Sequence, residues 1–188
     1  MSIIKLKNPK TEHYNKCKKN ILNSEFTWNH YKEFVPKRNN NKKLLTSNLE
    51  LIENKHDEFS IYTHVFLHRP TRHTLYSRKY SQYLDDIVKL LGDIFNANAQ
   101  IMDHFNMMVR CSVNAVHPEP KYIRTVPHTD HNFPHKNMLI YLTDAGGSTF
   151  VEGEEFAPEE DDVIIFEGTH WHELPKEERR VVLVMTYI

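Results

Sequence analysis

The sequence predicts a mostly β, α+β fold in which short antiparallel strands form a sandwich or barrel. After Asn96 the chain consists of short runs that have the length and composition of strands. Gly and Pro residues, which favour tight turns, separate these runs. No helix-like periodic segments alternate with the runs, so a parallel α/β sheet is not expected.

The strand prediction covers six segments of the chain. In the first of them Ile61, Thr63 and Val65 alternate with outward positions, which is the two-residue period of a strand. The other segments are short, rich in β-branched and aliphatic residues, and bounded by turn residues. The predicted strands are 59–67, 107–116, 137–142, 148–152, 162–166 and 180–188.

One helix is predicted, near residues 80–97. Its apolar residues recur at steps of three and four, which gives one apolar face that braces a sheet. These residues are Tyr80, Tyr83, Leu84, Ile87, Leu91, Ile94 and Phe95. The first fifty residues are polar and rich in Lys and Asn, and we expect them to form an irregular segment packed on the rest.

The length of 188 residues predicts a single domain, 1–188. Within it, residues 1–100 form an N-terminal support region and residues 101–188 form the β core. No apolar run approaches twenty residues, so we expect a cytoplasmic protein without a membrane partner. Cys17 and Cys111 are too few for a disulfide framework, which predicts two reduced thiols.

The net charge of −1 hides a basic N-terminal part and an acidic segment between residues 144 and 180. The basic run Lys37, Arg38, Lys42 and Lys43 is typical of a solvated loop. We therefore do not expect nucleic acid as a partner.

The first candidate ligands for a metal ion are His128 and Asp130. Alternate residues of an extended segment project to the same side, so an imidazole and a carboxylate at this spacing can reach one ion. The triplet His117-Pro118-Glu119 has the same spacing, but its prolines make a rigid turn and no matching strand follows. We therefore prefer His128 and Asp130.

A third ligand is expected from the segment after the strand 162–166, where His170 and His172 lie two residues apart. Two imidazoles and one carboxylate leave open positions on the ion, an arrangement that suits Fe(II). A structural zinc ion would need a closed tetrahedral shell. Because both histidines are available, a three-histidine site of a cupin-like zinc or manganese protein stays an alternative.

Arg179 and Arg180 begin the last strand, shortly after these histidines. An arginine that enters the interior of a barrel needs an anion, and its guanidinium group binds a carboxylate through two parallel hydrogen bonds. Strand alternation sends only one of the two inward, and the sequence leaves the register open.

From Met107 to the C-terminus the sequence resembles the Fe(II)/2-oxoglutarate-dependent oxygenases, particularly their prolyl-hydroxylase-like branch. The resemblance rests on six elements in the family's order. They are His128-Thr129-Asp130, Leu139-Ile140-Tyr141-Leu142-Thr143-Asp144, Gly146-Gly147-Ser148-Thr149, Phe166-Glu167-Gly168, His172 with Pro175, and Arg180. The resemblance implies a double-stranded β-helix, a jelly-roll and cupin-like fold, with N-terminal helical support.

The resemblance also implies roles for individual residues. His128, Asp130 and His172 match the iron ligands, and His172 fits the spacing from Phe166 and Pro175 better than His170 does. Arg180 matches the residue that binds the C5 carboxylate of 2-oxoglutarate, with Arg179 as the alternative. Tyr141 matches a tyrosine that hydrogen-bonds the same carboxylate in some members, although a core tyrosine is an equal reading.

The activity that the resemblance implies is a dioxygenase that hydroxylates a substrate and releases succinate and CO2. Family members that halogenate have a small residue in place of the acid, so Asp130 favours hydroxylation. The implied cofactors are Fe(II) and 2-oxoglutarate, with ascorbate as a candidate reductant. We expect a small molecule or a protein side chain as substrate, and no motif identifies it. The alternative function is a non-catalytic, cupin-like module that binds a divalent metal.

Overall fold

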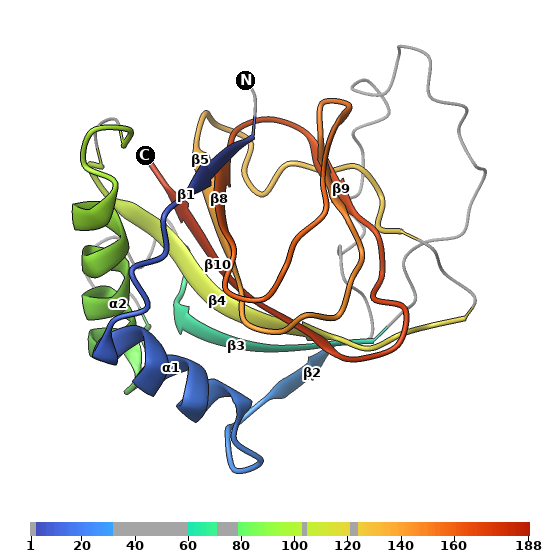
Figure 1. The fold of residues 1–188 in the computed structure, drawn as a ribbon, viewed down its shortest axis with the longest axis horizontal. Helices are drawn as coiled ribbons and strands as arrows, with labels where there is room; N and C mark the ends of the chain where they lie inside the picture. Colours follow the sequence, from blue (N-terminus) through green and yellow to red (C-terminus); the bar gives the residue numbers. More distant parts are fainter. Residues whose placement is uncertain (1–2, 32–59, 71–78, 103–104, 121–123) are drawn as a thin grey trace.

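The computed structural model describes residues 3–31, 60–70, 79–102, 105–120 and 124–188. Two antiparallel sheets enclose the interior, and two helices cover the outer side of the larger sheet (Figure 1). In spatial order the larger sheet contains β1 (Ile4–Leu6), β8 (Val163–Phe166), β5 (Lys136–Tyr141), β10 (Arg180–Tyr187), β4 (Met108–Val116), β3 (Ile61–Leu67) and β2 (Asn29–Tyr31). The smaller sheet contains β7 (Glu154–Phe156), β6 (Thr149–Val151) and β9 (His170–His172). The predicted mostly β fold is confirmed.

Each predicted strand has a counterpart among the described residues, with bounds that differ by one or two residues. The first begins at Ile61, and Phe59 lies outside the described residues. Four strands of three residues each were not predicted, namely β1, β2, β7 and β9. Segments this short carry too few residues to show a two-residue period.

The prediction of an irregular N-terminal segment is wrong for α1 (Glu12–Leu22). The side chain of Thr11 caps this helix by accepting a hydrogen bond from the backbone N–H of Tyr14. Tyr14, Cys17 and Ile21 are its buried residues. Their spacing of three and four places them on one face, which packs against the second helix.

The second helix, α2 (Leu84–Ala97), confirms the predicted helix but begins later than expected. Tyr80 was assigned to its apolar face, yet it is 73% exposed and forms a β-bridge with Leu67. Ile87, Leu91 and Ile94 of the predicted stripe are buried, and the unpredicted Leu90 is buried with them. The remaining members other than Tyr80 are partly buried against the same core, so this face does brace the sheet.

Alternate residues of the central strand β10 face opposite sides of the larger sheet. Val181, Leu183 and Met185 belong to the main core, which also contains the buried residues of both helices. Because successive side chains alternate, Arg180, Val182 and Val184 face the interior between the sheets. The guanidinium carbon of Arg179 instead lies 5.9 Å from the centre of the Trp28 ring. The register thus sends Arg180, and not Arg179, inward.

Cys17 and Cys111 are free, as predicted, and both are buried. Within the described ranges, no helix is both long and apolar enough to cross a membrane. The basic run Lys37, Arg38, Lys42 and Lys43 lies outside the described residues.

Candidate metal centre

Three imidazoles converge at the edge of the smaller sheet because of one backbone pairing. His128 and His170 exchange two backbone hydrogen bonds, of 2.9 and 3.0 Å, so their side chains leave the strands on the same side. His172 lies two residues further along β9 and also projects to that side. One ring nitrogen from each of the three lies within 4.8 Å of those of the other two. This spacing is short enough for a shared metal ion.

The second ring nitrogen of each histidine has a partner of its own. Nδ1 of His128 lies 2.8 Å from the carbonyl oxygen of Val126, and Nδ1 of His170 lies 3.3 Å from that of Gly168. Nδ1 of His172 lies 2.8 Å from Oγ1 of Thr149. Such partners orient a metal-binding imidazole and fix its tautomer. These contacts use Nδ1 of each ring, so the three Nδ1 atoms are turned towards the protein and not towards a shared ion.

Asp130 lies beside this group. Its Oδ2 is 3.7 Å from Nε2 of His170, and its Oδ1 is 4.0 Å from a guanidinium nitrogen of Arg69. Burial acts to raise the pKa of Asp130, but four nearby basic groups, His170, His128, Arg110 and Arg69, together lower it below its ordinary value. The side chain is thus a carboxylate at neutral pH.

Two of the histidines, His170 and His172, are neutral in the same range of pH. Burial lowers the pKa of His170 to about 4 and that of His172 well below its ordinary value. Neutral imidazoles and an ionised carboxylate are the forms that bind a metal ion, so no proton has to be displaced from them first. This donor set of nitrogen and carboxylate ligands fits Fe(II).

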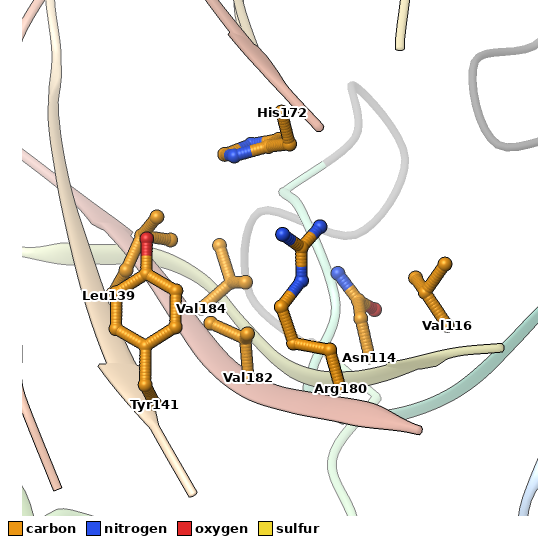
Figure 2. Close-up of a pocket in the computed structure, with 8 residues that line it drawn as sticks. All are labelled: Asn114, Val116, Leu139, Tyr141, His172, Arg180, Val182 and Val184. Atoms are coloured by element: carbon orange, nitrogen blue, oxygen red, sulfur yellow. The ribbon is translucent and has the colours of Figure 1, made fainter. Parts of the chain in front are cut away.

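A pocket lies directly below His172 in Figure 2. The guanidinium group of Arg180, the hydroxyl of Tyr141 and the amide of Asn114 all point into it (Figure 2). Apolar side chains form the rest of its lining, namely Val116, Leu139, Val182 and Val184. The cavity volume of the pocket is about 30 Å³.

Arg180 is 5% exposed, and its Nη1 donates hydrogen bonds to the carbonyl oxygens of Gly147 (3.0 Å) and Glu173 (2.8 Å). Within the described part of the chain no carboxylate forms a salt bridge with it. The nearby charge of Glu173 acts on this guanidinium group, but its hydrogen bonds go to neutral carbonyls. A buried cation of this kind is stabilised when an anion binds next to it. The pocket is therefore built to accept an anionic group.

Tyr141 and Thr149 connect this pocket to His172. The Tyr141 hydroxyl lies 2.6 Å from Oγ1 of Thr149, which in turn contacts Nδ1 of His172. Burial raises the pKa of Tyr141 to about 12, so its hydroxyl keeps its proton and can donate it in a hydrogen bond. Tyr141 thus lines the pocket, and it also packs in the second apolar cluster.

The sequence left two of these residues unassigned. Thr149 was part of a recognised turn without a role, and Asn114 was only part of a predicted strand. The alternation of 107–116 and 180–188 could have paired Asn114 with Val182, but only once the register was known. The rejected candidate His117 is exposed at the end of β4, outside the three-histidine group.

No protein-family model matches the sequence, and no curated protein sequence matches it. Among solved structures, the chain is similar to a 2OG-Fe(II) oxygenase family oxidoreductase from Burkholderia pseudomallei. The identity is 18%, the TM-score is 0.51, and the match covers 68% of this chain and 67% of that chain.

Two further structures match with lower scores. A prolyl hydroxylase from Trichoplax adhaerens, in complex with a hypoxia inducible factor oxygen degradation domain peptide, is 10% identical with a TM-score of 0.45. That match covers 68% of this chain and 62% of that one. A Cupin_2 domain of an XRE family transcriptional regulator from Enterobacter cloacae is 11% identical with a TM-score of 0.36, over 42% of this chain and 80% of that one.

The Burkholderia structure shows the fold. The chain has the jelly-roll, double-stranded β-helix architecture that was predicted from its C-terminal half, and the resemblance to 2OG-Fe(II) oxygenases holds at this level.

Proposed function

We propose that this chain is an Fe(II)- and 2-oxoglutarate-dependent dioxygenase. The observation that carries the proposal is the position of Arg180, a buried guanidinium group in the same pocket as a candidate metal ligand, His172. A dicarboxylate with a 2-oxo group needs these two features together, a metal ion to chelate at one end and a cation at the other.

For the iron ligands we propose His128, Asp130 and His172. His172 is preferred because it lines the pocket of Arg180, whereas His170 contacts the carboxylate of Asp130 instead. Arg180 and Tyr141 would hold the C5 carboxylate. Their guanidinium group and phenol hydroxyl are hydrogen-bond donors that point into the pocket, as the amide of Asn114 also does (Figure 2).

When bound, Fe(II) and 2-oxoglutarate would supply the oxidising chemistry, in which O2, 2-oxoglutarate and a substrate C–H bond become CO2, succinate and a C–OH group. The chain would orient the dicarboxylate through Arg180 and would shield it from water with Leu139, Val182 and Val184. The hydrogen bond between Nδ1 of His172 and Oγ1 of Thr149 would keep the ring of His172 in place.

A thermal-shift titration tests the proposal. Mn(II), which binds oxygen and nitrogen ligands without turnover, should raise the melting temperature, and 2-oxoglutarate should raise it further only when Mn(II) is present. Glutarate, which lacks the 2-oxo group, should give a much smaller increase. Arg180→Met should remove the effect of 2-oxoglutarate and keep that of Mn(II), while the matched control Arg179→Met should keep both.

A wild-type protein that Mn(II) stabilises but 2-oxoglutarate does not would contradict the proposal. That result would instead support a second candidate, a non-catalytic, cupin-like module that binds a divalent metal. The specific observation in favour of this candidate is the close group of His128, His170 and His172. Three imidazoles with one carboxylate at hand also suit zinc or manganese.

A further inference from the structure

The interior face of the larger sheet is polar at both ends of β10. Arg180 lies at one end of this face. At the other end Thr186 is paired with Arg110 on β4 and with Asn137 on β5, so the three residues form one row across neighbouring strands. Thr186 is an even number of residues from Arg180 and Val182 on β10, so its side chain projects to the same interior face. Residues paired directly across strands project to the same face, so Arg110 and Asn137 also lie on the interior side. We call Arg110, Thr186 and Asn137 the distal row.

The distal row lies next to the candidate metal centre. Oγ1 of Thr186 is 2.7 Å from Nε2 of His131, and His131 directly follows Asp130 in the chain. His131 in turn stacks on Phe133, with ring centres 4.9 Å apart. The row is thus placed on the side of Asp130, whereas the pocket of Arg180 is placed on the side of His172.

Several polar groups here have no partner within the described ranges. Asn137 is 0% exposed, and neither its Nδ2 nor its Oδ1 forms a hydrogen bond. The same holds for Oγ of Ser112, which lies on the interior side one pair further along β4. Arg110 is partly buried, and its guanidinium group has no hydrogen bond or ion pair. A buried amide without a partner destabilises the folded protein, so a ligand that pairs with these groups removes an unfavourable contribution.

The charge around the row is positive. Arg69 follows the end of β3 and reaches Asp130 to within 4.0 Å. Arg110 also lies close enough to His68 to act on its charge. Burial lowers the pKa of His68 most, and the charges of Lys79 and Arg110 lower it further. Two carboxylates lie on this side. Glu167 pairs with Lys136 at 4.0 Å, and Asp130 interacts with Arg110 but has a charge that a metal ion would neutralise. The site thus favours an anion.

We propose that the distal row is the subsite for the substrate and that it binds an oxyanion of the substrate, a carboxylate or a phosphate group. Arg110 pairs with the charge, and the amide of Asn137 hydrogen-bonds one of its oxygens. This inference rests on the proposed oxygenase function, because it assigns the Arg180 end of the interior to 2-oxoglutarate. It narrows the substrate to an anionic molecule that is oxidised at a carbon near its acidic group.

The test uses two small probes on the full chain, inorganic phosphate and acetate, which distinguish the two oxyanions. Thermal shift and isothermal titration are recorded with saturating Mn(II) and 2-oxoglutarate, so that the Arg180 end is occupied. At least one probe should raise the melting temperature further. Arg110→Met should weaken binding of that probe about tenfold or more, the loss expected for a charge-assisted hydrogen bond. The control Arg179→Met also loses one positive charge and should bind as the wild type does.

Arg110→Gln and Asn137→Leu provide second variants in case Arg110→Met does not fold, and both should weaken binding of the probe. Binding that is unchanged in all three variants, or the absence of any effect of either probe, would overturn the assignment of the distal row. A probe that binds only without 2-oxoglutarate would also overturn it, because the probe would then occupy the Arg180 end. Each of these results leaves the stabilisation by Mn(II) with 2-oxoglutarate intact, so failure of this inference is distinguishable from failure of the proposed function.

Discussion

Oγ1 of Thr149 lies 2.8 Å from Nδ1 of His172, and this contact links β6 to β9 within the smaller sheet. Thr149→Val keeps the shape of the side chain but removes the hydroxyl. The ring of His172 then loses its orienting partner, and the buried Tyr141 hydroxyl loses its hydrogen bond with Thr149. Since partners of this kind contribute about 10- to 100-fold to metal affinity, we expect a loss of that size for Mn(II), measured by calorimetric titration.

Thr169→Val is the matched control, because Thr169 lies in the same segment as His172 but is exposed. It should bind Mn(II) as the wild type does. Equal Mn(II) affinities for Thr149→Val and the wild type would show that Thr149 does not orient a ligand.

The carbonyl oxygen of Gly147 accepts a hydrogen bond from Nη1 of Arg180. The φ of Gly147 is +84°, and a Cβ atom there would lie 2.8 Å from the carbonyl oxygen of Glu173 and 3.0 Å from Nη1 of Arg180. Gly146, with φ +67°, has no atom within 4 Å of such a Cβ, so it provides a control with backbone strain alone. We expect Gly146→Ala to lower the free energy of unfolding by about 1–2 kcal/mol and Gly147→Ala to lower it by about 2–4 kcal/mol.

Chemical denaturation measures these differences, and the thermal shift with 2-oxoglutarate measures the effect on the pocket. Gly147→Ala should also reduce the 2-oxoglutarate shift, because Arg180 must move, whereas Gly146→Ala should not. Equal behaviour of the two variants would mean that the loop near Arg180 adapts without cost.

The sequence predicted the larger strands and α2 because each carries enough residues to show its period. It did not predict α1, whose buried residues are only Tyr14, Cys17 and Ile21 among many Lys and Asn residues. Within the candidate site, the triplet His128-Thr129-Asp130 and Arg180 were recognisable in order along the chain. The inward direction of Arg180, and the interior position of Arg110 and Asn137, follow from pairing between strands far apart in sequence, and no local pattern specifies that register.

Asp161 joins the N-terminal segment to the turn before β8. Its carboxylate accepts hydrogen bonds from Lys10, Lys18 and Tyr14. Burial acts to raise the pKa of Asp161, but these hydrogen bonds lower it to about 2. A pKa that is lower in the folded state stabilises the protein above the unfolded value of about 4, and this stabilisation is lost as the pH falls towards 2.

Asp161→Asn keeps the side-chain shape and tolerates the positive φ of 71° at this position. Allowing for solvent screening, we expect it to lower the free energy of unfolding by roughly 1–2 kcal/mol at pH 7. The difference from the wild type should shrink between pH 4 and pH 2, as measured by urea denaturation. A difference that is independent of pH in this range would contradict the role of the carboxylate.

The two thiols should be unreactive in the folded protein. Burial is the main cause that raises the pKa of Cys17 to about 11 and that of Cys111 to about 12, so almost no thiolate is present at pH 8. We expect both thiols to react with Ellman's reagent at once in guanidinium chloride and very slowly in buffer. If the native protein rapidly released one equivalent of thionitrobenzoate, one thiol would be accessible. A helix or strand that covers Cys17 or Cys111 would then open readily.

His170 and His172 differ in what lies beside them, and this difference separates the two readings of the metal centre. His172 lines the pocket of Arg180, so His172→Gln should lose both the binding of Mn(II) and the stabilisation by 2-oxoglutarate. His170 contacts Asp130, so His170→Gln should weaken Mn(II) binding only about tenfold, the effect of a residue that positions a ligand. The exposed His117 is the control, and His117→Gln should change neither measurement. If His170→Gln abolishes metal binding while His172→Gln keeps it, the ion is held by His170 in place of His172. If each substitution alone abolishes metal binding, the site is the three-histidine kind, because only there is every imidazole a required ligand.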